Sequence, residues 1–390
     1  MTGKAKRRVY LDYSATTPVD SRVLEAMMPY FQQVFGNPSS AHQFGKAAQQ
    51  AVEQARQTLA QLLRCRESEI VFTSGGTESD NLAVRGVAYA NRAKGNHIIT
   101  SQVEHAAVLK TCRLLEKDGF AVTYVPVDEY GMVDPDTIRQ AIRKETILIS
   151  IIHANNEVGT INPIAEIGAL AQERGIYFHT DAVQSFGKVP IDVEAMNIHL
   201  LSISSHKIYG PKGVGALYVR RGIPLHSLLT GGGHEMGKRA GTHNVPGIVG
   251  LARAAAVMIE EMDQERQRIG ALREYFWQQI QKRMEPVYLN GHPRQRLYHN
   301  LNLSFPGCDG EALLMALDMY GIAVSTGSAC QSGSVEPSHV LKALGIGRER
   351  GTSALRFTLG RLTTREDIDY VLTVLEQVVA QQRQIHRHRA

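Results

Sequence analysis

Between about residue 40 and residue 255, the spacing of apolar positions alternates between helical and extended patterns. Residues 41–63 repeat their apolar positions at helical spacing, which predicts an amphipathic helix. Short apolar runs predict seven strands: 69–74, 97–100, 121–127, 147–154, 176–182, 200–204 and 215–220. Unbroken apolar strands separated by helical stretches are typical of a mostly parallel α/β sheet that is covered on both faces.

The pattern changes after residue 250. Residues 251–284 form one long helical run, charged on one side, which we expect to cross from one domain to the next. Three short strands are then predicted among helices, at 300–305, 321–326 and 353–360, which suits a smaller α+β domain. A chain of 390 residues is too long for one ordinary core. We therefore predict a large domain at 16–260 and a small domain at 1–15 and 261–390.

Composition narrows the class of protein. The chain is 43% hydrophobic and 21% charged, which is ordinary for a globular protein, and no run approaches the roughly 18 apolar residues of a membrane span. The basic start "MTGKAKRRVY" is not followed by the apolar region of a secretory signal. Four cysteines without C-x-x-C spacing fit a reducing cytoplasm, and the net charge of +5 is spread along the chain. We expect a cytoplasmic protein that binds neither membrane nor nucleic acid.

The ends of the predicted strands hold the candidate chemistry, because ligands of parallel sheets lie beyond the carboxyl ends of the strands. The first strand runs into Gly75, Gly76 and Thr77 and then a helix, an arrangement that can bind an anion through backbone N–H groups. A plain turn in which Thr77 caps the helix explains these residues equally well. This stretch alone therefore leaves both readings open.

Two further strand ends carry an acid and a base. Asp181 follows a buried strand, where it is either a helix cap or a carboxylate with a cationic partner. Lys207 comes 26 residues later, about one strand–helix–strand step, so both can face one cleft. Taken alone, Lys207 is more often an exposed loop residue. Together with the glycine turn, the two supply the Schiff-base lysine, acidic partner and phosphate cradle that pyridoxal 5'-phosphate (PLP) requires.

The second half of the chain adds a thiol and a guanidinium. Cys330 lies among Ser, Gly and Ala, with no apolar neighbours to bury it, so its thiol is expected to be accessible. Cys65 and Cys112 lie in helical stretches and fit ordinary burial better, and Cys308 is a turn residue with no other signal. Arg356 interrupts an apolar strand and suits capture of a substrate carboxylate, although an outward-facing strand residue is the plainer reading.

In combination, these motifs resemble the cysteine desulfurases, PLP enzymes of the class V aminotransferase fold. The resemblance runs essentially end to end, through "YLDYSATTPVD", "NPSSAH", "FTSGGTES", "EHAAV", "NNEVG", "TDAVQS", "SSHKIYGPKG", "RAGTHNVPGIVG", "GSACQSG" and "LRFTLGR". It implies PLP-dependent fold type I, an α/β architecture in which a mostly parallel seven-stranded sheet forms the large domain beside a smaller α+β domain. It also implies a homodimer with shared sites.

The resemblance assigns a role to each candidate residue. Lys207 would be the Schiff-base lysine, Asp181 would face the pyridine nitrogen, and Gln184 the ring hydroxyl. His105 would stack on the ring and move protons. The phosphate would be held by Gly76, Thr77, Ser204 and His206, and Thr242 would reach the phosphate of the partner subunit's cofactor. The substrate carboxylate would be bound by Asn156 and Arg356. Cys330 would be the nucleophile that receives sulfur.

The implied reaction removes sulfur from L-cysteine and gives L-alanine and a persulfide on Cys330. A loop rich in Ser and Gly would let Cys330 swing between the cofactor and an acceptor. The long loop resembles the group that serves iron–sulfur assembly and nitrogenase maturation, in which Cys330 would ligate a cluster only transiently with a scaffold and no intrinsic metal is expected. The chain ends without the longer C-terminal extension with which housekeeping members bind their scaffold, so the resemblance leaves the sulfur acceptor open.

Three other functions remain compatible with parts of this pattern. A selenocysteine lyase or an aminotransferase acting on a small amino acid would share the fold, but an aminotransferase has no need of an accessible thiol. A catalytically idle scaffold subunit would not need Lys207, Asp181 and Cys330 together.

Overall fold

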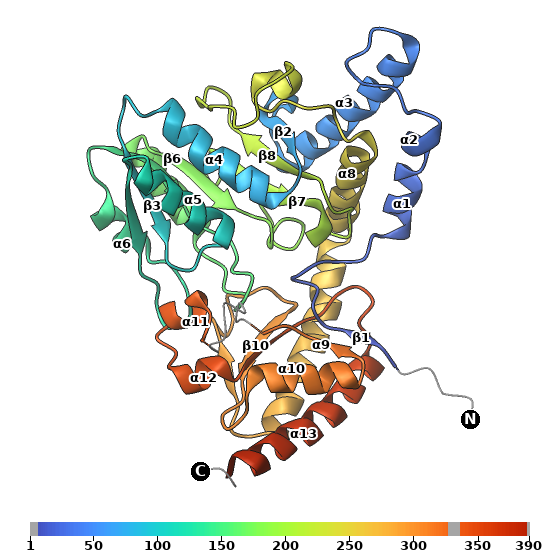
Figure 1. Ribbon diagram of the computed structural model, residues 1–390, viewed down its shortest axis with the longest axis vertical. Helices are drawn as coiled ribbons and strands as arrows, with labels where there is room; N and C mark the ends of the chain where they lie inside the picture. Colours follow the sequence, from blue (N-terminus) through green and yellow to red (C-terminus); the bar gives the residue numbers. More distant parts are fainter. Residues whose placement is uncertain (1–6, 327–335, 388–390) are drawn as a thin grey trace.

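A seven-stranded sheet forms the centre of the larger part of the molecule (Figure 1). The computed structural model describes residues 7–326 and 336–387. The strand order is β2-β8-β7-β6-β5-β3-β4, in which β8 pairs antiparallel with both neighbours and the other pairs are parallel. The strands are β2 (Ile70–Thr73), β3 (His97–Ser101), β4 (Ala121–Val125), β5 (Thr146–Ser150), β6 (Tyr177–Asp181), β7 (Leu200–Ser204) and β8 (Gly215–Val219). The predicted mostly parallel sheet is confirmed.

Helices cover both faces of this sheet, which explains why its strands are apolar without alternation. Adjacent residues of β7 show the arrangement: Leu201 packs into the core beneath one set of helices, and Leu200 packs into the core on the opposite face. The helices of this part are α1 (Ser21–Met27), α2 (Pro29–Gln32), α3 (Gln43–Leu63), α4 (Gly76–Ala90), α5 (Ala106–Lys117), α6 (Pro135–Ala141), α7 (Ile164–Arg174) and α8 (Val245–Glu260). Short 3-10 helices are η1 (Glu67–Glu69), η2 (Ser205–Lys207) and η3 (His234–Gly237).

A second core lies below the first in Figure 1. It packs helices against a three-stranded antiparallel sheet of order β12-β10-β9 and a parallel pair, β1 with β11. Its strands are β1 (Val9–Tyr10), β9 (Tyr288–Asn290), β10 (Asn300–Ser304), β11 (Ile322–Ala323) and β12 (Ala354–Thr358). Its helices are α9 (Met262–Arg283), α10 (Gly310–Met319) and α13 (Arg365–Arg387). Two short helices complete this part of the chain: α11 (His339–Ala343), which packs in a separate small cluster with Val103 and Val158, and α12 (Arg348–Thr352).

The segment before residue 15 connects the two cores. Val9 and Leu11 are buried in the second core, whereas Tyr13 packs into the first. The precise domain boundaries expected from the sequence, at residues 16 and 260, remain a prediction.

The structure corrects one predicted helix and adds two strands, β1 and β9. Residues 251–284 do not form a single helix, because α8 ends at Glu260 and α9 begins at Met262, with Glu261 between them at φ −95° and ψ 2°. Strand β9 had no sequence signal, since its three residues lack an alternating apolar pattern. Within the described part of the chain, no helix combines the length and apolar content needed to span a membrane.

Candidate active site

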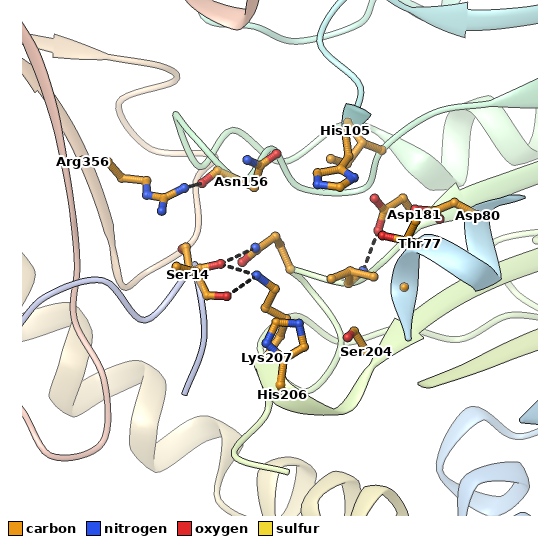
Figure 2. Close-up of a pocket in the computed structure, with 15 residues that line it drawn as sticks. Ser14, Thr77, Asp80, His105, Asn156, Asp181, Ser204, His206, Lys207 and Arg356 are labelled. Atoms are coloured by element: carbon orange, nitrogen blue, oxygen red, sulfur yellow. Dashed lines mark hydrogen bonds between the residues drawn. The ribbon is translucent and has the colours of Figure 1, made fainter. Parts of the chain in front are cut away.

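A pocket of about 370 Å³ lies beyond the carboxyl ends of β6 and β7, between the large sheet and the strand that carries Arg356 (Figure 2). A volume of this size suits a small molecule. Its lining comprises Ser14, Ala15, Gly76, Thr77, Asp80, His105, Ile152, Asn156, Asp181, Val183, Gln184, Ser204, His206, Lys207 and Arg356. The structure therefore brings together almost all of the described site residues that the sequence predicts.

Lys207 reaches this pocket from η2, directly after the buried strand β7. Its ammonium donates to the backbone carbonyls of Ser14 at 2.6 Å and Ala15 at 2.7 Å. Burial, followed by the positive charge of Arg356, lowers the pKa of Lys207 to about 8. A large share of Lys207 is therefore a neutral amine just above neutral pH, the form that reacts with carbonyl groups.

Asp181 and His105 face each other across the pocket. Asp181 ends β6, and its Oδ1 accepts the backbone N–H of Val183 at 2.8 Å. Burial raises the pKa of Asp181, while the hydrogen bond from Val183 and the charge of Lys207 oppose that rise. The Nδ1 of His105 accepts the N–H of Ala107, so a neutral ring carries its proton on Nε2. Burial lowers the pKa of His105, which favours this neutral ring.

The N-terminus of α4 forms one end of the pocket. Gly75 precedes the helix at φ 152° and ψ −177°, a backbone conformation that is essentially restricted to glycine. The expected alternative in which Thr77 caps the helix is wrong, because Gly75 is the cap and Thr77 lies inside the first turn. Ser204 and His206 line the same end from β7 and η2. Free N–H groups at such a helix start favour an anion.

Gln184 lies in the turn that follows Asp181 and is 5% exposed. Its side-chain Nε2 donates to the carbonyl of Ser14 at 2.9 Å. Its Oε1 is buried and has no protein partner. A buried amide oxygen without a donor is costly, so this atom is available to a ligand in the pocket.

Arg356 closes the opposite side of the pocket from β12. Its Nη1 donates to the backbone carbonyl of Asn156 at 2.9 Å, and its Nη2 to Asp12 Oδ1 at 2.7 Å, while its buried Nε has no partner. The alternative reading of Arg356 as an outward-facing strand residue is therefore wrong, because the residue is 7% exposed. Its backbone also pairs in both directions with Ser325, at 2.7 and 3.2 Å.

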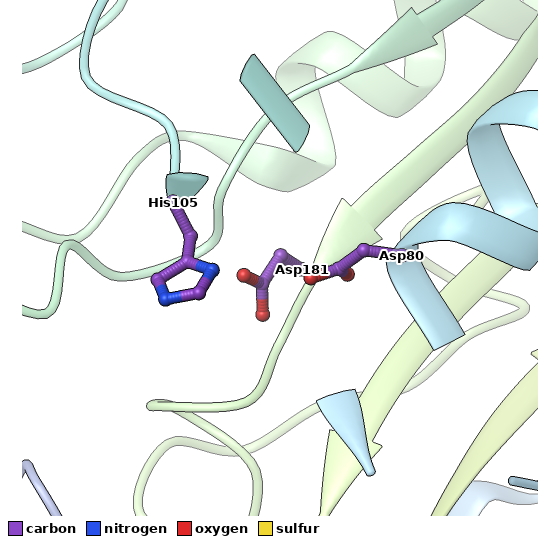
Figure 3. Close-up of side chains that lie close together, drawn as sticks. All are labelled: Asp80, His105 and Asp181. Carbon is purple, nitrogen blue, oxygen red and sulfur yellow. The ribbon is translucent and has the colours of Figure 1, made fainter. Parts of the chain in front are cut away.

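Asp80, on the first turns of α4, joins His105 and Asp181 in a cluster of titratable groups (Figure 3). One ligand atom from each of the three lies within 4.8 Å of the others, a spacing close enough for a metal ion. Both carboxyl groups are buried. Burial, followed by the charge of Asp181, raises the pKa of Asp80 well above its usual value.

The amino-acid sequence places this pocket in a known family. Residues 9–371 match the family described as Aminotransferase class-V. The cysteine desulfurase IscS of Dictyoglomus turgidum is 54% identical over 97% of this chain and 96% of its own length. That of Methanosarcina thermophila is 54% identical over 96% of this chain and 92% of its own length. This chain belongs to the cysteine desulfurases of the class-V aminotransferase family.

Solved structures of relatives have the same fold. A NifS-like protein superposes with a TM-score of 0.91 at 38% identity, covering 96% of this chain and all of that chain. SspA in complex with cysteine superposes with a TM-score of 0.81 at 41% identity, covering 90% of this chain and 98% of that chain. As a cysteine desulfurase, the chain thus has both the fold and the family that its motifs predicted.

Thr242 is the described candidate residue that lies outside the pocket. It lines a second cavity of about 890 Å³ beside Glu235 and His243. The Glu235 carboxylate accepts from Arg56 at 2.8 and 2.9 Å, from the backbone N–H of Phe72 at 2.7 Å, and is 2.6 Å from His243 Nε2. This buried ion pair fixes the segment that presents Thr242 to the surface. The expectation that Thr242 serves a partner subunit stays a prediction.

The described cysteines of this desulfurase are poor nucleophiles. Burial raises the pKa of Cys65 and of Cys112 to about 12, and it also raises the pKa of Cys308. Cys112 is buried in α5 as expected, Cys65 is only partly buried just after α3, and Cys308 packs on the second core. Cys330, the predicted nucleophile, lies outside the described residues.

Sequence reasoning missed several residues of the site. Asp12, Ser14 and Ala15 all contact a predicted site residue, but they lie in the segment near the N-terminus, far from Lys207 and Arg356 in sequence. Asp80 also lines the pocket, and no motif in the sequence indicates this position. A signal for Asp12 did exist, because it lies in the quoted stretch "YLDYSATTPVD". A charge directly after a short apolar strand is a reason to examine that position.

Proposed function

We propose that this chain binds PLP on Lys207 and removes sulfur from L-cysteine, with Cys330 as the sulfur acceptor. The observation that carries the proposal is the convergence of Lys207, Asp181 and the start of α4 on one pocket. An amine, a buried carboxylate and an anion site are the three groups that PLP requires of a protein.

The donor set of the pocket fits PLP atom by atom. The unpartnered Oε1 of Gln184 is free to accept from the ring hydroxyl, and the buried Asp181 carboxylate suits a protonated ring nitrogen. The open backbone at Gly76 and Thr77 suits the phosphate. A cationic ring nitrogen beside Asp181 would also offset the cost of burying that carboxylate.

When bound, PLP supplies an imine-forming aldehyde and an electron sink for bonds broken at the substrate Cα. Lys207 provides the amine, and once the substrate has taken its place, the freed amine accepts the Cα proton. Its lowered pKa leaves the amine neutral often enough for both steps near neutral pH. Asp181 would keep the ring nitrogen of bound PLP protonated, and His105, which holds a proton on Nε2, would stack on that ring.

Arg356 and Asn156 bind the substrate carboxylate in this proposal. The unpartnered Nε of Arg356 and its remaining N–H groups are free for a carboxylate while Nη2 stays on Asp12. Fixing the carboxylate at this side of the pocket orients the substrate thiol relative to Lys207. The solved relative described as SspA in complex with cysteine supports L-cysteine as the substrate.

Cys330 takes the sulfur. Its thiolate attacks the sulfur of L-cysteine, an S–S bond forms, the Cβ–S bond breaks, and the carbon part leaves as L-alanine after protonation. The pKa values of Cys65, Cys112 and Cys308 are raised, so these thiols are rarely thiolates near neutral pH, and this supports Cys330 as the acceptor. The persulfide then passes to an acceptor thiol by exchange. We propose an iron–sulfur scaffold or another sulfur-acceptor protein, in the cytoplasm.

The working unit is proposed to be a homodimer in which Thr242 completes the partner's site. Apolar side chains with no cover on the described chain support this assembly. They gather on α1, α2 and the segment leading into α3: Leu24, Met28, Phe31, Phe35 and Phe44. Exposed apolar groups in such number mark an interaction surface.

Brief exposure of the PLP-loaded protein to L-cysteine tests the function. Mass spectrometry should find one additional sulfur atom on Cys330 and equimolar L-alanine in solution. Cys330→Ser should abolish both while the visible absorbance of bound PLP remains, and Cys308→Ser serves as the matched control with full activity. Sulfur on Cys308 alone, or pyruvate formed in place of alanine, would reject the assignment.

A further inference from the structure

Asp80 has no role in the proposed reaction, yet it is buried beside Asp181 at the pocket. It is 1% exposed, and its Oδ1 has no hydrogen-bond partner. An ionised carboxylate in such a place is costly unless a cation or several donors accompany it. The charge state of Asp80 therefore depends on what faces it.

The groups that face Asp80 include no cation in the part of the chain that the structure describes. From β6, His179 Nε2 lies 3.7 Å from Asp80 Oδ1. The two ring nitrogens of His179 are already engaged with the hydroxyls of Ser150 at 2.9 Å and Ser202 at 3.0 Å. Burial lowers the pKa of His179 to about 3, so its ring is neutral.

The remaining neighbours are acidic or neutral. From the connection between β3 and α5, Glu104 accepts from Ser101 Oγ and the N–H of Ile152, and burial raises its pKa to about 8. His105, beside it, is neutral. Lys207, from η2, faces Asp181. Because Lys207 is directed at Asp181, no positive charge among the described groups balances a second carboxylate at Asp80, and one carboxyl group of the pair is expected to keep its proton.

Asp181 is the member of the pair that keeps the negative charge. Its Oδ1 accepts a backbone N–H, and the positive charge of Lys207 favours its ionised form. Asp80 Oδ1 accepts nothing. We propose that Asp80 is a positioning residue that stays protonated, so that the pair holds one negative charge, located on Asp181 and directed at the cofactor ring. The cofactor part of this inference rests on the proposed function.

The cluster of Asp80, His105 and Asp181 has a competing explanation in a divalent cation, because its ligand atoms lie close enough together. A cation would require both carboxyl groups to be ionised, whereas a shared proton requires only one. The two explanations therefore differ in the protonation of Asp80 in the PLP-free protein, which can be measured without any enzyme assay.

Infrared difference spectroscopy of the PLP-free protein provides the first test. At neutral pH, wild type minus Asp80→Asn should contain the C=O band of a protonated carboxyl group. Wild type minus Glu104→Gln, the matched control, should contain a separate band from Glu104. If Asp80→Asn lost no such band, Asp80 would be ionised in the wild type and the proposal would be overturned. Asp80→Ser, also neutral, replaces Asp80→Asn if that variant does not fold.

The visible absorbance of bound PLP provides the second test. The absorbance is recorded as a function of pH, and the pH at which half of the change has occurred is the midpoint. Because Asp80→Asn replaces one neutral group by another, its midpoint should match that of wild type. Asp181→Asn, the positive control, should lower the midpoint by about one unit or more through loss of a real negative charge. An equal fall in Asp80→Asn would contradict the proposal. Failure of the wild-type protein to show the absorbance would refute PLP binding instead, and leave the infrared result standing.

Titration with zinc chloride provides the third test, using the metal alone on the PLP-free protein. Calorimetry should detect the same zinc binding, or the same lack of it, in wild type and in Asp80→Asn. Micromolar binding that is present in wild type and lost in both Asp80→Asn and Asp181→Asn would identify a cation site and reject the shared proton.

Discussion

Lys207 lies among groups that act on its charge in opposite directions. Burial and the charge of Arg356 disfavour its ammonium form, whereas Asp12 and Asp181 favour it. Arg356 and Asp12 also form an ion pair with each other. Arg356 and Asp12, which pair with each other, therefore both act on the pKa of the Lys207 amine and so on its reactivity.

The rate at which PLP-free protein takes up PLP should rise with pH through about 8, because only the neutral Lys207 amine attacks the aldehyde. Arg356→Gln removes a cation and should raise this midpoint by roughly half a unit to one unit. Asp12→Asn removes an anion and should lower it by a similar amount. Stopped-flow growth of the visible absorbance measures all three. Shifts in the same direction for both variants would contradict this account of the Lys207 pKa.

Single residues with a strong chemical preference could be predicted from the sequence, and their contacts could not. Asp181 ends the buried strand β6 and Lys207 comes shortly after the buried strand β7, and the rule that ligands bind at strand ends is enough to select both. The partners of these residues depend on tertiary packing. Ser14, Asp12 and Asp80 reach the pocket from elements whose local pattern contains no information about Lys207 or Arg356.

The turn between β2 and α4 depends on its backbone more than on its side chains. Gly75 has a positive φ, and the strand opposite approaches it closely: a Cβ on Gly215 would lie 2.7 Å from Gly75 Cα. Two glycines in contact let β8 pair with β2 up to the point where α4 begins. This close pairing fixes the direction in which the first N–H groups of α4 point.

Gly75→Ala should therefore weaken PLP binding by about tenfold, equivalent to about 1.4 kcal/mol, because the strained backbone shifts the start of α4. Fluorescence titration with PLP measures this affinity. Gly270→Ala in α9 is the matched control, since its Cβ would meet Tyr298 Cβ at an ordinary 3.8 Å. The control should bind PLP as wild type does. Unchanged affinity in Gly75→Ala would show that the turn tolerates a side chain.

Helices and strands could be predicted from the sequence where every residue of the segment has a similar degree of burial. Strands buried on both faces, such as β5 and β7, have continuous apolar runs and were identified. The α8–α9 break was missed because Glu261 suits a helix, and its non-helical backbone follows from how α9 docks on the second core. Strand β9 is too short for a pattern and exists because β10 pairs with it.

In the described part of the chain, exposed apolar side chains gather on a surface formed by α1, α2 and the start of α3. Phe35 is 65% exposed and its ring centroid lies 5.7 Å from that of Phe44. This surface is built on the same elements, α1 to α3, as the neighbourhood of Ser39, which contacts His234 near Thr242. A second copy docked on this surface would bring Thr242 close to the interface between the subunits.

Phe35→Asp should weaken the proposed dimer by at least about 30-fold, the effect of losing an apolar anchor of roughly 2 kcal/mol. Light scattering after size exclusion across a dilution series reports this change. Met319→Asp, 74% exposed on α10, is the control and should leave the mass unchanged. A monomeric wild type, or equal effects of both variants, would refute this dimer surface.

The pairing of Ser325 with Arg356 limits where sulfur can be handed over. Cys330 follows Ser325 by five residues, and five extended residues span at most ~18 Å, whatever path they take. In the proposed reaction, the Cys330 thiol would therefore stay tethered to the strand that would bind the substrate carboxylate, and its local concentration near the pocket would be on the order of millimolar or higher. An acceptor protein would have to approach within that distance, so the length of the tether, in addition to surface complementarity, would limit which proteins can collect the sulfur.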